Sequence, residues 1–274
     1  MNKKILSLKL DCLSKEDLIN LLNYLSLEGY KNLSKADLIR KILESTANEE
    51  SINKFIKEQY NLRTESIDIE KIKKEIKKVR NIKWGVVQGE LDRKIQTELV
   101  RKTYSYNQLI SRIKTNLYNE VKGYVIASWY NYWTTFIIEN FIAKHEKVVP
   151  TLKPVKGIDL FWKEVPFDLK ITYLPKNYWE SNLSTKDVKK EIIKWLYENQ
   201  GAQRFGSENR LFIVLHNKNN PEKSWELKRD FDSIFMELDR YLKEEVIDEQ
   251  EDLIIFKFRR KTYSAIGKLC LIIK

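Results

Sequence analysis

Cysteine and histidine are scarce in this chain of 274 residues, which contains two of each. The cysteines, Cys12 and Cys270, are too few for a disulfide framework or a zinc finger. The histidines, His145 and His216, lie far apart in the sequence and form no metal-binding pair. These shortages argue against enzymes whose chemistry depends on histidine. Any catalysis must therefore use carboxylates and lysine.

Long apolar runs are also missing. No stretch approaches the roughly 18 apolar residues that span a bilayer. After Met1-Asn2-Lys3-Lys4, the apolar residues are interrupted by Lys9 and Asp11, which does not fit a secretory signal. The sequence therefore predicts a soluble, cytoplasmic protein of prokaryotic type that has no membrane partner and no small-molecule cofactor.

Positive charge is abundant. The formal net charge is +11 and the isoelectric point is about 9.3, which favours a polyanionic partner. An AT-rich genome can also contribute to the high lysine content. The hydrophobic fraction of 42%, with seven Trp, fourteen Tyr and eleven Phe, is sufficient for a packed core. At this length we expect one large domain or two modest ones.

The stretch from Ile158 to Thr172 holds the side chains best suited to catalysis. It predicts two short strands joined by a tight connection near Lys163-Glu164. In the second strand, apolar residues alternate with Pro166, Asp168, Lys170 and Thr172. Residues i and i+2 of a strand share a face, so Asp168 and Lys170 are expected side by side. If the strands pair, Asp159 joins them, and two carboxylates with an ammonium can hold Mg²⁺ and position a water for attack on phosphate.

The pattern of Asp159, eight residues and then Asp168-Leu169-Lys170 resembles the active site of the PD-(D/E)XK nucleases, a superfamily that includes most type II restriction endonucleases. The resemblance implies that Asp159 and Asp168 are metal ligands and that Lys170 activates water or contacts phosphate. Gly157-Ile158 stands where the family name has proline. The competing interpretation is an exposed strand face that carries a solvated ion pair.

The flanking segments extend this resemblance from about residue 125 to the C-terminus. Upstream, residues 128–142 predict a helix whose Glu139 matches, by order and residue type, an acidic residue that many members use as a further metal or water ligand. The competing interpretation of Glu139 is a partly exposed helix carboxylate. Downstream we expect a helix at 182–199, a buried strand at 210–216, a helix at 223–245 and strands at 253–256 and 269–273. The expected fold class is α/β (α+β), a restriction-endonuclease-like mixed central sheet flanked by helices and preceded by a helical region.

The N-terminal segment predicts a pair of short helices. Ser14 and Ser34 are expected to cap them, and Gly29 lies where the first would end. The sequence around Gly29, followed by Lys35-Ala36-Asp37-Leu38-Ile39, resembles the SAP-type DNA-binding module. The resemblance implies contacts to the DNA backbone from Lys31, Lys35 and Arg40. The competing interpretation is a helical hairpin that serves packing or protein binding.

Between this module and the catalytic strands we expect mainly helices. Residues 45–66 predict a linker with some helix, and helices are expected at 67–82, 91–101 and 104–123. The lysines of 67–82 can line a DNA channel or simply face solvent. The expected division is a SAP-like module at 1–48, a helical bridging region at 49–122 and a nuclease core at 123–274.

A loop near residues 200–209 offers a candidate for base reading. Glycines bracket Gln203 and Arg204, whose side chains suit bidentate contacts to adenine and guanine. The alternative is an ordinary loop that leads into the strand at Arg210.

Together these features predict a Mg²⁺-dependent endonuclease similar to type II restriction enzymes. It would cleave double-stranded DNA at a specific sequence, leave 5′-phosphates and act as a homodimer. Two alternatives stay open. One is a structure-specific or repair nuclease of the same superfamily, and the other is a DNA-binding protein without catalysis.

Overall fold

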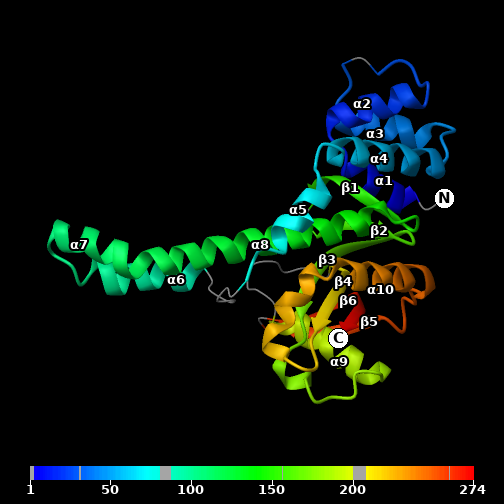
Figure 1. Ribbon diagram of the computed structural model, residues 1–274. Helices are drawn as coiled ribbons and strands as arrows, with labels where there is room; N and C mark the ends of the chain where they lie inside the picture. The colour runs from blue at the N-terminus through cyan, green and yellow to red at the C-terminus, as the bar shows by residue number, and fades with distance from the viewer. Residues whose placement is uncertain (1–2, 31, 81–87, 156, 200–207, 259) are drawn as a thin grey trace. The chain divides into compact units, whose positions relative to one another are not determined.

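The computed structural model describes residues 3–274 apart from 31, 81–87, 156, 200–207 and 259 (Figure 1). The chain divides into two compact units. One combines Met1–Ile67 with Glu139–Lys274, and the other is Asp68–Ile138. The N-terminal helices thus belong to the same unit as the sheet, whereas the expected division placed them in a separate module at 1–48.

The first unit is built on a mixed sheet of six strands. In chain order these are β1 (Val148–Val155), β2 (Ile158–Trp162), β3 (Val165–Tyr173), β4 (Arg210–His216), β5 (Leu253–Phe258) and β6 (Lys261–Ile273). Their order in the sheet is β1-β2-β3-β4-β6-β5. β1, β2 and β3 form an antiparallel meander, β4 is parallel to both β3 and β6, and β5 pairs antiparallel with β6. A mixed α and β fold is therefore confirmed. Strand β1 was not predicted from the sequence pattern.

The turn between β2 and β3 has the backbone of a tight hairpin. Lys163 and Glu164 both have positive φ, 49° and 63°, as the central residues of a type I′ turn require. Neither is glycine, so neighbouring contacts must offset the conformational cost. Lys163 donates to the backbone oxygens of Lys243 and Glu245 at the end of α10 (Phe231–Glu244), and Glu164 pairs with the buried Lys9. The expected tight connection is confirmed, and these contacts anchor it on both sides.

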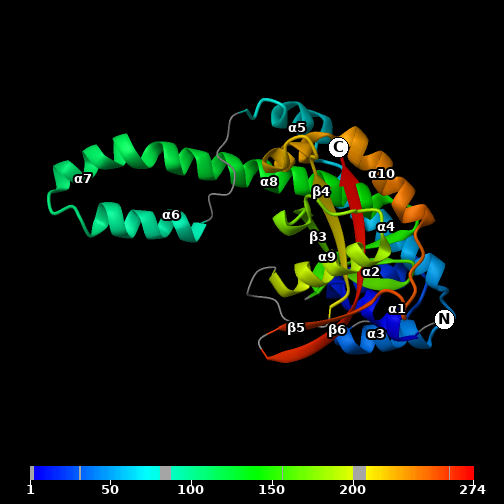
Figure 2. The same cartoon turned by 90° about the horizontal axis from the view of Figure 1, so that it is seen from below.

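Two helices cover the sheet on opposite faces (Figures 1 and 2). Helix α9 (Lys186–Asn199) packs Ile192 and Leu196 on the face that presents Phe212 and Val214. Helix α10 lies over the other face, where the Leu242 backbone oxygen accepts a hydrogen bond of 3.2 Å from Trp162 Nε1. The helix expected at 223–245 begins later than predicted, because Pro221–Arg229 forms a separate 3₁₀ segment, η4.

Four N-terminal helices form a bundle against β1 and β2. They are α1 (Lys3–Asp11), α2 (Lys15–Tyr24), α3 (Lys35–Glu44) and α4 (Glu49–Thr64). The caps at Ser14 and Ser34 are confirmed, since each hydroxyl accepts from the backbone N–H three residues later. Residues 45–66 were expected to be a linker with some helix; the helix is present as α4, but it packs into the core and is not a linker. Ile52, Phe55 and Ile56 recur at helical spacing, and burial of that face gives α4 a stable position.

The second unit is helical. It contains α5 (Ile69–Ile76), α6 (Gln88–Lys94), the π-helical segment η1 (Ile95–Val100), α7 (Tyr106–Arg112), a second π-helical segment η2 (Ile113–Leu117) and most of α8 (Tyr118–Lys144). The expected helices at 104–123 and 128–142 are thus parts of one nearly continuous helical run. The C-terminal end of α8, from Glu139 onward, belongs to the first unit.

Candidate active site

Asp159 and Asp168 lie opposite each other on the paired strands β2 and β3. Leu160 pairs with Phe167 and Phe161 with Pro166, and continuing this register by one residue sets Asp159 opposite Asp168. Asp159 Oδ2 also accepts a hydrogen bond of 2.8 Å from the Leu169 backbone N–H. The expectation that strand pairing would bring Asp159 to the Asp168 face is confirmed.

Lys170 shares this face and contacts Asp168 directly. Its Nζ lies 2.7 Å from Asp168 Oδ1 and 3.3 Å from the Leu169 backbone oxygen. The Lys170 side chain is 28% exposed, whereas that of Asp168 is 2% exposed. The alternative of a solvated ion pair on an open strand face is therefore wrong for Asp168. This carboxylate is enclosed by protein, and Lys170 extends from it toward solvent.

Arg210 closes the other side of Asp168 and was not singled out from the sequence. Its Nε lies 3.2 Å from Asp168 Oδ2, an ion pair without hydrogen-bond alignment, and its guanidinium carbon lies 5.1 Å from the centre of the Tyr197 ring. The Arg210 side chain is only 6% exposed. An arginine at the start of a wholly apolar buried strand is a usable signal, because a buried cation requires a partner. Arg210 holds Asp168 in place from the neighbouring strand.

Glu139 is near enough to Asp159 to interact with it electrostatically. Solvent reaches this residue, but crowding by protein atoms and the negative charge of Asp159 raise its pKa to about 7. The positive charges of Lys170 and Lys228 oppose this rise. The structure thus places Glu139 beside the strand residues, as its position in the sequence suggested.

Lys228, on η4, is a second lysine at this site that the sequence did not reveal. It is 2% exposed, and its Nζ lies 5.8 Å from the centre of the Tyr173 ring at the end of β3. Desolvation lowers the pKa of Lys228 to about 8, against the charge of Glu139, which raises it. Only the tertiary fold brings η4 here, so sequence spacing contained no signal for it.

The facing carboxylates fit a cation. Desolvation and the charge of Asp168 raise the pKa of Asp159, although the hydrogen bond from Leu169 and the charge of Lys170 oppose the rise. A carboxylate whose pKa is raised by a neighbouring negative charge is stabilised when a divalent cation binds between the two groups. Among the described residues, no group of three His, Cys, Asp or Glu side chains is spaced to hold a metal. Asp159 and Asp168 therefore fit as a pair, and Glu139 does not complete a three-ligand cluster.

Of the five residues expected to contact DNA, the structure describes two, Lys35 and Arg40. Lys35 Nζ donates to the Asp11 backbone oxygen at the end of α1 over 2.8 Å, so this lysine connects two helices of the bundle. Arg40 is exposed and lies 3.3 Å from Asp37. Lys31, Gln203 and Arg204 lie outside the described residues. A DNA-contacting role for these five residues stays a prediction.

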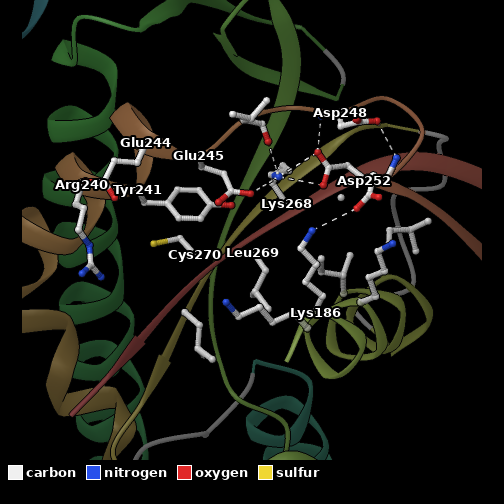
Figure 3. A pocket seen from close by; sticks show the side chains of 18 of the residues that line it. Lys186, Arg240, Tyr241, Glu244, Glu245, Asp248, Asp252, Lys268, Leu269 and Cys270 are labelled. Atoms are coloured by element: carbon white, nitrogen blue, oxygen red, sulfur yellow. Dashed lines mark hydrogen bonds and ion pairs between the residues drawn. The ribbon is translucent and has the colours of Figure 1, made fainter. Parts of the chain in front are cut away.

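A groove of about 710 Å³ lies elsewhere, between α9, α10 and the second half of β6. Figure 3 shows the Lys268 ammonium directed at Glu245 and Asp252. Its Nζ also donates to the Val246 backbone oxygen over 2.9 Å. Both acidic and basic residues line the groove, and the buried Lys268 ammonium is already paired with carboxylates. None of the candidate catalytic residues lines it.

Both cysteines are buried and free, and burial raises the pKa of each thiol to about 12. Among the described residues, no helix combines the length and the apolar character that crossing a membrane requires.

In comparisons with known proteins, the chain matches no family model, no curated protein and no solved structure.

Proposed function

We propose that the chain is a Mg²⁺-dependent endonuclease that hydrolyses phosphodiester bonds of double-stranded DNA, with an active site of the PD-(D/E)XK type. The observation that carries this proposal is one cluster on the β2–β3 pair. Asp159 and Asp168 face each other, Lys170 lies 2.7 Å from Asp168, and the charge of Asp159 acts on Glu139.

The side chains can divide the work as follows. Asp159 and Asp168 would hold Mg²⁺. When bound, this ion would stabilise the negative charge that builds up on the pentavalent phosphate. Lys170 would orient the attacking water or contact the phosphate, since its partly exposed ammonium can reach both the carboxylates and solvent. Glu139 has a pKa of about 7 and can take up a proton near neutral pH.

The surrounding elements support this reading. From β2 onward the chain runs strand, strand, helix, strand, helix, strand, which is the order expected from the resemblance. The net charge of +11 favours a polyanionic substrate. Cleavage of both strands at a symmetric target is most simply achieved by two copies of the site, so we propose a homodimer on DNA.

Asp159→Asn is the best test of the site because Asp159 is exposed. Asp168→Ala is less informative, since it removes the nearer of the two carboxylates beside the buried Arg210, Glu208 being 4.0 Å away, and destabilises the fold. We expect Asp159→Asn to reduce DNA cleavage in Mg²⁺ by about 100-fold or more while the Kd for DNA changes little. Asp232→Asn, at an exposed carboxylate on α10, is the matched control and should cleave normally.

The assay uses a mixed plasmid library with Mg²⁺. Discrete bands from the unaltered chain support site-specific cleavage, and preference for branched substrates supports the repair nuclease instead. If the unaltered chain binds DNA and does not cleave it, the result supports a DNA-binding protein without catalysis. Full-rate cleavage by Asp159→Asn would remove Asp159 from the active site.

A further inference from the structure

The second unit contains a helical hairpin whose far end has no assigned role. Helix α6 and η1 run alongside the beginning of α8, with α7 and η2 at the end (Figures 1 and 2). Lys94 Nζ pairs with Glu120 over 2.6 Å, which joins the two arms. We define the tip as residues 101–106, the connection between η1 and α7 together with the first residue of α7.

The tip has a defined conformation. Arg112 Nη1 donates to Thr103 Oγ1 over 3.0 Å and contacts the Lys102 backbone oxygen at 3.5 Å. These contacts hold the connection against the following helix. The side chains of Arg101 and Lys102 are exposed beside it. Two cations are thus presented from a fixed backbone at the end of the hairpin.

The charge around the tip is of one sign. No Asp or Glu occurs among the 21 residues between Glu98 and Glu120, where Arg101, Lys102, Arg112 and Lys114 provide four positive charges. The whole second unit holds fourteen Lys and Arg against seven Asp and Glu, so it carries +7 of the chain's +11 in about a quarter of its length. Such local charge is complementary to phosphate.

Exposed aromatic rings accompany the cations. Tyr104 is 99% exposed and Tyr106 is 74% exposed. A tyrosine that gains nothing from burial within its own chain is available to stack on a nucleic-acid base, and every unpaired base has a ring face for this purpose. Phosphate-binding cations interleaved with stacking rings are the combination that single-stranded nucleic acids require.

We propose that the tip binds a DNA strand, with Arg101 and Lys102 on its phosphates and Tyr104 stacked on an unpaired base. The choice of DNA rests on the proposed function. The tip would strengthen binding to duplexes that carry an unpaired segment. The chemistry is separate from that of the carboxylate site, because the tip contributes affinity and no catalytic group.

The test measures binding of the full chain by fluorescence anisotropy, without divalent cations, to a blunt duplex and to the same duplex with a single-stranded tail. Arg101→Gln with Lys102→Gln should weaken binding to both DNAs. It should also flatten the dependence of log affinity on log salt by about 1.8, since each phosphate contact contributes roughly 0.9. Lys190→Gln with Lys194→Gln removes the same charge from exposed positions on α9 and is the matched control, for which we expect a smaller change of slope.

The ring is tested separately. Tyr104→Ala should weaken binding to the tailed duplex by roughly 5-fold to 100-fold and leave the blunt duplex unchanged. Tyr104→Phe keeps the ring and should keep the affinity. Equal salt slopes for the tip variant and the α9 control would overturn the phosphate contact. A loss with Tyr104→Phe as large as that with Tyr104→Ala would overturn the stacking.

Sedimentation of the same variants covers the other possible occupant, a second copy of this chain. If the tip variants change the mass in solution and leave DNA affinity unaltered, the tip is a self-association surface and the proposal is wrong. Because binding is measured without cleavage, its outcome is independent of the catalytic test. Tip-dependent binding by a chain that never cuts DNA would refute the nuclease and retain the DNA contact.

Discussion

At the scale of single residues, the candidate site combines enclosed charges with accessible ones. Asp168 and Arg210 are 2% and 6% exposed in their side chains and depend on each other. Asp159 and Glu139 are reached by solvent. Removing one member of a buried pair leaves a charge without compensation, whereas an exposed carboxylate can be replaced at little cost. Catalytic and structural effects of mutation are therefore best separated at Asp159.

Lys228 leads to a prediction about stability and pH. Its pKa is lowered from 10.5 to about 8, so at neutral pH the fold buries a charge that the unfolded chain exposes to water. The lowering is about 2.5 pKa units and one unit corresponds to about 1.4 kcal/mol, so Lys228→Met should raise the free energy of unfolding at pH 7 by up to about 3.5 kcal/mol. Urea denaturation followed by tryptophan fluorescence measures this change.

The sign of the effect follows from proton binding. Between pH 8 and 10.5 the unfolded state holds the Lys228 proton more than the folded state does, so the unaltered chain gains stability as pH rises. The advantage of Lys228→Met should therefore shrink across this range. Lys190→Met, at an exposed position, is the control and should show no such trend. An advantage that stays constant to pH 10.5 would contradict the assigned cause.

At the scale of elements, the β2–β3 hairpin links three parts of the first unit. Its turn contacts α1 through Glu164 and Lys9, and the end of α10 through Lys163. Lys9 is fully enclosed and also lies 2.9 Å from Glu49 and 3.0 Å from Asn53, both on α4. The hairpin that carries Asp159 and Asp168 is therefore anchored at its turn by the N-terminal bundle and by α10.

The contact of α9 with β6 depends on a residue without a side chain. A Cβ at Gly267 would lie 2.5 Å from Ile193 Cγ2 and 3.0 Å from Ile254 Cγ1. Gly267→Ala should therefore push α9 from the sheet and lower the free energy of unfolding by about 1–3 kcal/mol. Thermal unfolding followed by circular dichroism measures the loss.

Gly123→Ala is the matched control. A Cβ at Gly123, within α8, meets nothing within 4 Å, and alanine is the better helix former. This variant should be as stable as the unaltered chain or slightly more stable. A Gly267→Ala protein that unfolds at the temperature of the unaltered chain would show that α9 can move without loss of packing.

At the scale of the whole molecule, the N-terminal helices and the sheet share a hydrophobic core. Leu6, Leu10, Leu18 and Leu21 belong to one cluster with Val149 of β1 and Phe161 of β2. Two interpretations of the N-terminal region were open from the sequence, an appended DNA-binding module or a structural part of the fold. This shared core supports the structural role, and contact with DNA from exposed positions such as Arg40 remains compatible with it.

Deletion of residues 1–48 should therefore destabilise the first unit and do more than weaken DNA binding. It would expose Val149 and Phe161, which are 6% and 1% exposed, and leave Glu164 without Lys9. We expect the truncated protein to unfold at a denaturant concentration well below that of the full chain, since each large apolar side chain contributes roughly 1.5–3 kcal/mol by burial. Arg40→Gln, which removes an exposed charge from α3, is the control and should leave the unfolding midpoint unchanged. If the truncated protein unfolds at the same denaturant concentration as the full chain, residues 1–48 are an independent module and the structural role is wrong.

The sequence by itself determined the elements whose signals are local. The alternation from Val165 to Thr172 identified β3, the serines at 14 and 34 identified two helix starts, and the apolar run at 210–216 identified β4. Such signals come from backbone periodicity and from capping groups a few residues away. Only the tertiary structure decided that Arg210 encloses Asp168, that Lys228 is buried near Glu139 and that α1–α4 complete the core against β1 and β2. These relations join segments that are distant in the chain, and burial, which determines the cost of each charge, is a property of the folded molecule.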